Sequence, residues 1–317
     1  MDGVLIIDKP AGLTSHDVVA RVRRILGERR VGHTGTLDPF ATGVLVVLVG
    51  RATRLAQFLS GADKEYEAVI RVGFATETGD ITGMPCSDER NRAGETHSIS
   101  WNEEEIEAAF ASLRGEIDQV PPMYSAKKLR GRRLYELARR GAEIAREPVG
   151  VSIYQFETIG PSVGLLRQNQ DGTVDLAVHV VCSAGTYVRA LAESFGEKLG
   201  VGAHLAGLRR TRAGDFRFND AITLEQLKEN VDKASLGTIL LPPDAALSKM
   251  PFVHLSASDV DRARHGVVIP MKEGPPQIWA DGEKVRMRDQ DGNLMAIGIY
   301  DQARRLLHPR VVLAAEK

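Results

Sequence analysis

The alternation of strand-like and helix-like apolar patterns along the chain constrains its fold more than any other feature. Val4–Ile7 and Val44–Val49 are short aliphatic runs of the kind that form buried strands. Between them, apolar residues from Val18 to Leu26 recur at helical spacing, with Ser15 placed to cap the helix and Gly27 to end it. Because strands and helices are interleaved, the sequence predicts an α+β (mixed α/β) body with a central mixed sheet flanked by helices.

The rest of the chain continues this interleaving. Strands are predicted near Tyr66–Val72, Val151–Phe156 and Val174–Val181, and helices after Asn102, within Gly185–Leu199 and after Thr223.

A cluster of prolines, Pro242, Pro243 and Pro251, predicts a domain boundary near residue 250. Beyond it, two apolar stretches flank Asp291-Gly292, a pair that favours a hairpin turn. The last segment is therefore predicted to be a small β domain, and the predicted domains are residues 1–247 and 248–317.

Composition and length exclude several classes of protein. The chain has 317 residues, of which 43% are hydrophobic and 26% charged, as in ordinary soluble globular proteins. Its longest aliphatic run, Val44–Val49, falls far short of the roughly 20 residues needed to cross a bilayer, and no secretory signal is recognised. Cys86 and Cys182 lie far apart without a metal-binding pattern. We therefore expect a cytoplasmic protein without a metal site, a disulfide framework or a membrane span.

The net charge of −1 is the sum of two opposed segments. Nine acidic residues between Glu77 and Glu107 face only two arginines, and this segment, which contains Gly79 and Gly83, is predicted to be a surface excursion. From Tyr124 to Arg146, eight basic residues face two acidic ones, a local charge of +6. Such a charge run is typical either of a solvated face or of a surface that binds a polyanion such as nucleic acid.

A polar loop, residues 31–43, separates the first predicted helix from the strand Val44–Val49 and contains three glycines. The known phosphate-cradling glycine patterns are absent, which argues against the use of a nucleoside triphosphate. Asp38 precedes Pro39 and is either a turn residue or a catalytic carboxylate. His33 is either an ordinary loop histidine or part of the same site.

Two residues outside this loop also have an ordinary and a functional interpretation. Tyr66 is either a half-buried strand aromatic or a site residue. Arg189 falls within the apolar face of its predicted helix, so it is either a surface arginine or a buried guanidinium that demands a carboxylate partner. Residue types alone indicate a soluble enzyme with a candidate RNA-binding surface, and no serine triad or metal cluster is recognisable.

Six separated sequence blocks occur in a characteristic order. They are Gly3–Pro10 with Gly12–Ser15, Gly32–Pro39 with Ala41–Gly43, Asp63–Tyr66, Pro122–Lys127, Gly185–Arg189, and Gly202–His204 with Leu208–Thr211. In these blocks the chain, up to the proline cluster, resembles the TruB family of tRNA pseudouridine synthases. The resemblance implies the pseudouridine synthase fold, followed by a small RNA-binding β domain of PUA type.

The resemblance also implies a reaction and a substrate. The family isomerises the uridine at position 55 in the T loop of tRNA to pseudouridine: the glycosidic C–N bond breaks, the uracil turns, and a C–C bond forms. The uridine must leave its stack before it can react. By the same resemblance the enzyme needs no cofactor or metal, binds the T stem-loop of tRNA, and acts as a monomer without an obligatory protein partner.

Three residues match catalytic positions of the family. Asp38 matches the essential aspartate, which acts as a nucleophile on the sugar or the base, or assists formation of a glycal-like intermediate. Arg189 matches the arginine that pairs with this aspartate and keeps it ionised. Tyr66 matches the aromatic residue that stacks on the target base and takes part in proton removal.

Other positions match substrate-binding residues of the family. His33 matches the loop residue that fills the space left by the uridine, Tyr187 and Leu208 match residues that flank the base, and Lys9 matches a residue that supports the active-site loop. The basic segment, about residues 121–148, matches an insertion that closes over RNA, and its expected contacts are Lys127, Lys128, Arg130, Arg132 and Arg133.

Two other functions fit parts of the same pattern. One is a pseudouridine synthase that depends on a guide RNA inside a larger particle, and the absence of a long basic tail argues against it. The other is a tRNA-folding chaperone, which requires binding and remodelling of tRNA but no chemistry.

Overall fold

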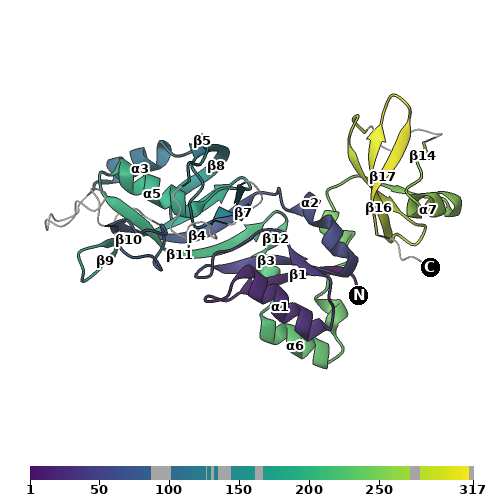
Figure 1. Cartoon of the computed structure of the whole chain (residues 1–317), viewed down its shortest axis with the longest axis horizontal. Coiled ribbons are helices and arrows are strands. Elements are labelled where there is room, and N and C mark those ends of the chain that lie inside the picture. The colour runs from purple at the N-terminus through teal and green to yellow at the C-terminus, as the bar shows by residue number, and fades with distance from the viewer. Residues whose placement is uncertain are drawn as a thin grey trace.

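The computed structural model of the chain describes residues 1–86, 101–125, 127–129, 132–134, 144–160, 167–271 and 279–313. Of residues 128, 129, 132 and 133 it describes the backbone only. Two bodies are apparent: a large sheet covered by helices, and a smaller sheet formed by the end of the chain (Figure 1). No helix in this described part is long and apolar enough to span a membrane.

The large sheet is mixed, as predicted. Its main path runs β1 (Gly3–Lys9), β3 (Thr42–Val49), β11 (Gly202–Ala213), β4 (Lys64–Gly73), β10 (Val174–Cys182), β8 (Val149–Thr158) and β5 (Gly115–Gln119). Three short strands extend it, with β2 (Val31–His33) on β3, β9 (Arg167–Gln168) on β10, and β12 (Phe216–Arg217) on β11. These pairings are antiparallel except that of β3 with β11, which is parallel through Thr42 and Arg209. The parallel contact joins the amino-terminal strands to the rest of the sheet.

Helices cover the two halves of this sheet separately (Figure 1). The described residues include the helices α1 (Ser15–Leu26), α2 (Ala56–Leu59), α3 (Glu103–Ala111), α5 (Val188–Lys198), α6 (Leu224–Asp232) and α7 (Ala257–Arg264). 3-10 helices occur at Gly50–Leu55, Phe218–Asp220, Leu236–Thr238 and Ala245–Leu247. α1 and α6 pack on β1 and β3, whereas α3 and α5 pack on β4, β10 and β8 around the rings of Phe110, Phe156 and Phe195.

The start of α1 differs from the prediction by one residue. Thr14, not Ser15, is the N-cap, and its side chain forms a reciprocal capping box with Asp17. Ser15 is instead buried, and its hydroxyl accepts a hydrogen bond from the Leu37 N–H at 2.9 Å. Gly27 ends the helix with a left-handed conformation, as predicted. The expected caps Asn102 and Thr223 are confirmed for α3 and α6.

The acidic segment is not a surface excursion throughout. Thr76 and Asp80 are buried, at 3% and 4% exposure, because the turn between them packs on β11. The Ile81 N–H donates to the Leu205 carbonyl, and the Leu205 N–H donates to the Gly79 carbonyl. The prediction is therefore wrong for this part of the segment, whereas residues 87–100 lie outside the described structure.

The second sheet has its own core. It contains β13 (Phe252–His254), β15 (Lys284–Arg288), β16 (Leu294–Asp301), β17 (Leu306–Val312) and β14 (Ile269–Pro270), with α7 packed on it. β15 and β16 pair antiparallel around Asp291-Gly292, which confirms the predicted hairpin. Ile297 and Val311 also join a cluster with Val4 and Val46, so that the second sheet is packed against the first.

One further two-stranded sheet lies in the basic segment. It pairs β6 (Lys128–Leu129) with β7 (Arg132–Arg133), and Leu134, which follows it, is buried.

Candidate active site

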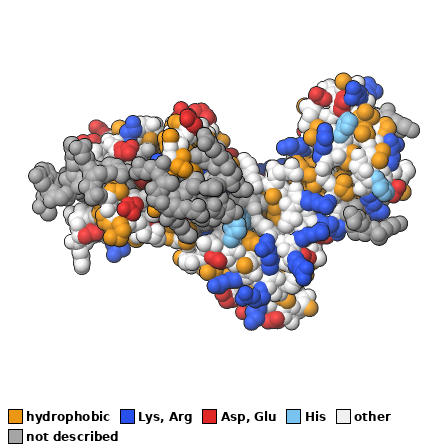
Figure 2. All heavy atoms as spheres, in the orientation of Figure 1, with side chains coloured by type: hydrophobic (Ala, Val, Ile, Leu, Met, Phe, Trp, Pro, Cys, Tyr) orange, Lys and Arg blue, Asp and Glu red, His pale blue; other side chains and the backbone are white. Residues whose placement is uncertain are grey.

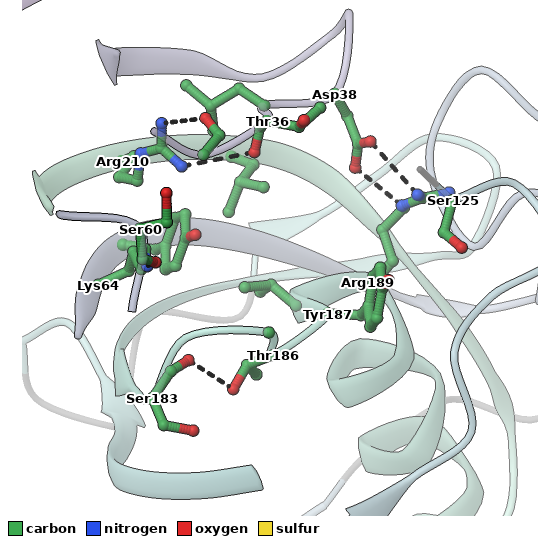
Figure 3. Close-up of a pocket in the computed structure, with 16 residues that line it drawn as sticks. Thr36, Asp38, Ser60, Lys64, Ser125, Ser183, Thr186, Tyr187, Arg189 and Arg210 are labelled. Carbon is green, nitrogen blue, oxygen red and sulfur yellow. Dashed lines mark hydrogen bonds and ion pairs between the residues drawn. The ribbon is translucent and has the colours of Figure 1, made fainter. Parts of the chain in front are cut away.

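A cavity of about 270 Å³ opens over the middle of the large sheet. Its walls come from the loop before β3, from β4 and β11, and from the residues that lead into α5 (Figure 3). Of the sequence-predicted site residues, Asp38, Tyr66, Tyr187, Arg189 and Leu208 all line it. Residues separated by as many as 170 positions are thus brought into one pocket, at the lower end of the size range for small-molecule sites.

Asp38 and Arg189 face each other at one side of the cavity (Figure 3). Arg189 Nε lies 2.9 Å from Asp38 Oδ2, and Arg189 Nη2 donates to Oδ1 at 3.3 Å. Two contacts from one guanidinium to both oxygens fix the orientation of the carboxylate as well as its position. Arg189 is only 4% exposed, which excludes the ordinary surface role that its sequence position left open.

The remaining donors of Arg189 hold two other segments at the site. Nη1 donates to the Thr78 carbonyl at 2.8 Å, and Nη2 donates to the Tyr124 carbonyl at 2.7 Å. Nη1 also lies 3.6 Å from Oδ2 of buried Asp80, so that the guanidinium sits between two carboxylates. Sequence reasoning missed Asp80 because it lies in the acidic segment, where nothing local marks it as buried.

The ionisation of Asp38 depends on this arrangement. Burial raises the pKa of the Asp38 carboxyl above its ordinary value, Arg189 opposes that rise, and the like charge of Asp80 adds to it. The Asp38 side chain nevertheless keeps 31% of its surface exposed to the cavity. A poorly hydrated but accessible carboxylate, oriented by a fixed cation, is suited to act on a bound group.

The loop that carries Asp38 is held from below by Lys9 and Ser15. Lys9 is fully buried, and its Nζ donates to the Ala41 carbonyl at 2.6 Å and to the Pro39 carbonyl at 3.2 Å. Burial lowers the pKa of Lys9 to about 8. Because Lys9 contacts loop backbone and does not line the cavity, the structure gives it a supporting place and no direct contact with a ligand.

Tyr66 and Tyr187 both contribute to the wall of the cavity. Tyr66 is 7% exposed, and burial raises the pKa of its phenol while neighbouring Arg210 lowers it. The backbone of Tyr187 is fixed by Gln119, whose side chain accepts from the Tyr187 N–H at 2.9 Å and donates to its carbonyl at 3.2 Å. Leu208 supplies an apolar part of the lining.

Two buried cations in the wall were not predicted as site residues. Arg210 and Lys64 are 2% and 8% exposed and line the side of the cavity opposite Asp38 (Figure 3). Both belong to sequence blocks that carry the family resemblance, but their burial depends on the pairing of β4 with β11 and is not visible locally.

The other predicted substrate-binding residues lie away from this cavity or outside the described atoms. His33 ends β2, does not line the cavity, and packs edge-to-face on His16 with ring centres 5.2 Å apart. Lys127 is exposed. The side chains of Lys128, Arg132 and Arg133, and all of Arg130, lie outside the described structure.

Two family models together match residues 23–248. The description "TruB family pseudouridylate synthase (N terminal domain)" matches residues 23–188, and "tRNA pseudouridylate synthase B C-terminal domain" matches residues 189–248. The chain belongs to the TruB family of pseudouridylate synthases. Its predicted family and enzyme class, an isomerase, are therefore confirmed.

Curated relatives extend this membership over the whole chain. A protein of Bacillus pumilus named tRNA pseudouridine synthase B is 38% identical over 318 aligned residues, which cover 100% of this chain and 99% of that one. A protein of the same name from Geobacillus thermodenitrificans is 43% identical, over 85% of this chain and 86% of its own length.

Solved structures of similar fold include a chain of an H/ACA RNP and a chain of a Cbf5 complex. A chain from "Structure of H/ACA RNP bound to a substrate RNA containing 2'-deoxyuridine" matches with a TM-score of 0.70 and 26% identity, over 99% of this TruB-family chain and 85% of that chain. A "Cbf5-Nop10-Gar1 Complex" gives a TM-score of 0.68 and 28% identity, over 99% and 84% of the two chains. The predicted pseudouridine synthase fold is confirmed.

Proposed function

We propose that this protein isomerises the uridine at position 55 in the T loop of tRNA to pseudouridine. The observation that carries the proposal is the Asp38–Arg189 pair inside a cavity. It occurs in a chain that aligns over nearly its whole length with proteins named tRNA pseudouridine synthase B. Asp38, Arg189 and Tyr66 are the proposed catalytic residues.

The chemistry follows from the position of the carboxylate. Breaking the bond between C1′ of the ribose and N1 of uracil builds positive character on C1′, which a nearby carboxylate stabilises or captures. The uracil then turns within the cavity and rejoins C1′ through C5. Tyr66 and Tyr187 provide aromatic walls on which the base stacks while it is detached.

Access to the cavity requires an everted nucleotide. Unstacking a base costs a few kcal/mol and is easiest in a loop, which favours the T loop over a stem. Exposed basic side chains are available to hold the surrounding phosphates. Figure 2 shows Lys and Arg side chains over the region of α1 and α6 and over the second sheet. On α1, Arg21 and Arg24 are exposed.

We also propose the division of labour along the chain. Residues 1–247 form the catalytic domain, with the basic segment 121–148 closing over RNA and Tyr124 linking that segment to Arg189. Residues 248–317 form an RNA-binding domain of PUA type, supported by the separate core of the second sheet. We expect the enzyme to be a cytoplasmic monomer that needs no protein partner.

A guide-RNA-dependent enzyme is the second candidate, because the structural neighbours include H/ACA particles. The higher identity to proteins named tRNA pseudouridine synthase B favours action on free tRNA. The test is to incubate the purified protein alone with an unmodified tRNA transcript and to map pseudouridine by sequencing. Conversion of a single T-loop uridine supports the proposal, whereas conversion only after addition of a guide RNA contradicts it.

A further inference from the structure

The charges around the cavity are unevenly distributed. On one side, Asp38 and Asp80 both pair with Arg189, and the charge of buried Lys9 also acts on Asp38, so that the two carboxylates have two cations to balance them. On the opposite side lie Arg210 and Lys64 (Figure 3). Among the residues that the structure describes, neither of these two cations forms an ion pair with a carboxylate.

The contacts of the two cations are all with neutral acceptors. Arg210 Nε donates to the Val44 carbonyl at 2.7 Å, and its Nη2 donates to the Gly35 carbonyl at 3.1 Å. Lys64 Nζ donates to the carbonyls of Ser60, at 2.8 Å, and Ala62. These bonds fix the side chains but do not neutralise them, and a buried cation without a counter-ion is costly to the folded state. Two such cations beside a cavity therefore indicate that a negative charge arrives there.

Lys64 retains its charge at neutral pH despite its burial. Burial, and secondarily the charge of Arg210, lower the pKa of Lys64 to about 8, which leaves the amine mostly protonated at pH 7. Arg210 supplies the second positive charge. The cationic side of the cavity is therefore doubly charged when the enzyme works.

Tyr66 lines the same cavity and interacts electrostatically with both sides. The charges on both sides affect its phenol, because Arg210 lowers the pKa of Tyr66 and Asp38 raises it. A base stacked on this ring would place its ribose toward Asp38 and its far edge toward Arg210 and Lys64. The electric field between Asp38 and the two cations would then point along the C1′–N1 bond, which is the bond that breaks.

We propose that Arg210 and Lys64 form a leaving-group site that stabilises uracil as an anion while it is detached from the ribose. The inference rests on the proposed function and adds residues to its chemistry. When the C1′–N1 bond breaks, its electron pair goes to N1 and is delocalised over the O2 and O4 oxygens of uracil. C1′ becomes electron-deficient and is balanced by Asp38. When C5 bonds to C1′, C5 loses one proton and N1 gains one, so the product is an isomer of the substrate.

Fixed charges aimed at a developing charge are effective catalysts because they need no reorganisation during the reaction. Removing one such donor typically lowers the rate by about 100- to 1000-fold. A structural role for the same cations would instead change folding or binding, and would not depend on how well the uracil itself carries negative charge.

The test compares two RNA hairpins with the T-loop sequence, one with uridine and one with 5-fluorouridine at the target position. Fluorine withdraws electrons, so the detached fluorouracil anion depends less on the protein for its stability. On the fluorouridine RNA, C5 has no proton to lose: when it bonds to C1′ it keeps fluorine, and water adds across the resulting C6–N1 double bond, OH to C6 and H to N1. The target nucleoside is therefore consumed in both RNAs, and the measured quantity is the single-turnover rate of its loss at saturating protein, for the natural enzyme, Lys64→Met and Lys64→Arg.

We expect Lys64→Met to slow the uridine RNA about 100-fold and the fluorouridine RNA about tenfold or less, with affinity for either RNA within about twofold of the natural enzyme. Lys64→Arg keeps a cation at this position, although a larger one, and should lose less of the rate on the uridine RNA than Lys64→Met does. Equal slowing on the two RNAs, a loss confined to affinity, or no slowing would overturn the proposal.

Two further variants keep the test decisive. Arg210→Gln keeps an amide N–H donor near the position of Nε, beside the Val44 carbonyl, but removes the charge and the contact with the Gly35 carbonyl. It should show the same dependence on the leaving group even if Lys64→Met does not fold. Arg212→Gln is the matched control, because Arg212 lies on the same strand but is paired with Glu65, and it should affect both RNAs equally. If the natural enzyme converts neither RNA, the proposed function fails; if it does and the variants show no such dependence, only this inference fails.

Discussion

At the scale of single residues, the decisive feature is the pairing of Asp38 with Arg189. The sequence placed Asp38 in a turn before Pro39 and left its role open, because an aspartate in that position is common without any catalytic function. The presence of a buried guanidinium 151 residues later resolves this, and such a distant contact has no local signal. Only the family resemblance connected the two residues beforehand.

The pair makes a prediction about pH. Asp38 must be ionised to act on C1′, and burial raises its pKa, so the rate should fall as pH drops through that value. Arg189→Ala removes the cation that opposes the rise, which moves the acid limb of the rate profile to higher pH. The single-turnover rate should therefore be low at neutral pH and should rise as the pH approaches about 8, the pKa of Lys64, above which Lys64 loses its charge.

A matched control is available in Arg71→Ala, which removes an arginine paired with Asp175 away from the cavity. The acid limb of the rate profile of Arg71→Ala should lie at the same pH as that of the natural enzyme. A constant fractional loss at every pH in Arg189→Ala would mean that the arginine orients the site without affecting ionisation.

At the scale of elements, most strands and helices were predictable because their signals are local. Apolar periodicity and capping residues placed α1, α3, α6, β3 and β4 within a few residues of their observed limits. The failures concern burial decided by distant partners. Asp80 is buried because its turn packs on β11. Ser15 does not cap the helix; its hydroxyl instead accepts a hydrogen bond from the Leu37 N–H.

Neighbouring Thr14 and Ser15 offer a direct comparison of two roles. Thr14→Ala removes a helix cap and should lower the free energy of unfolding by about 1 kcal/mol with little change in rate. Ser15→Ala leaves the buried Leu37 N–H without its acceptor, which should lower stability by about 1–3 kcal/mol. It should also slow catalysis, because Asp38 follows Leu37 directly. Urea unfolding and single-turnover rates measure both effects, and an equal rate for the two variants would argue against loop control by Ser15.

At the scale of the whole molecule, the two sheets are joined by polar and apolar contacts. Arg286 is 3% exposed and donates to the carbonyls of Met250 and Ser248, at 2.8 and 2.9 Å, and to the carboxylate of Asp244. The segment between the sheets is thereby held against β15. The prolines predicted a boundary here, but composition alone gave no sign that the junction is fixed by a buried arginine.

The basic segment should act on RNA binding and not on the chemical step. Replacing Lys127, Lys128 and Arg132 together by alanine should weaken tRNA binding and reduce the slope of log affinity against log salt by about 0.7 to 0.9 for each phosphate that the variant no longer neutralises. The rate at saturating protein should change little. Binding measured over a salt series tests this, and an unchanged slope would remove the segment from the interface.

The most direct test of the central claim is the single-turnover rate of Asp38→Asn on tRNA, measured together with its affinity. Asparagine keeps the size of the side chain and can still accept a hydrogen bond from Arg189, but it has no negative charge for C1′. We predict that the variant binds tRNA as the natural enzyme does and forms no detectable pseudouridine. Pseudouridine formation by Asp38→Asn at a rate near that of the natural enzyme would contradict the account.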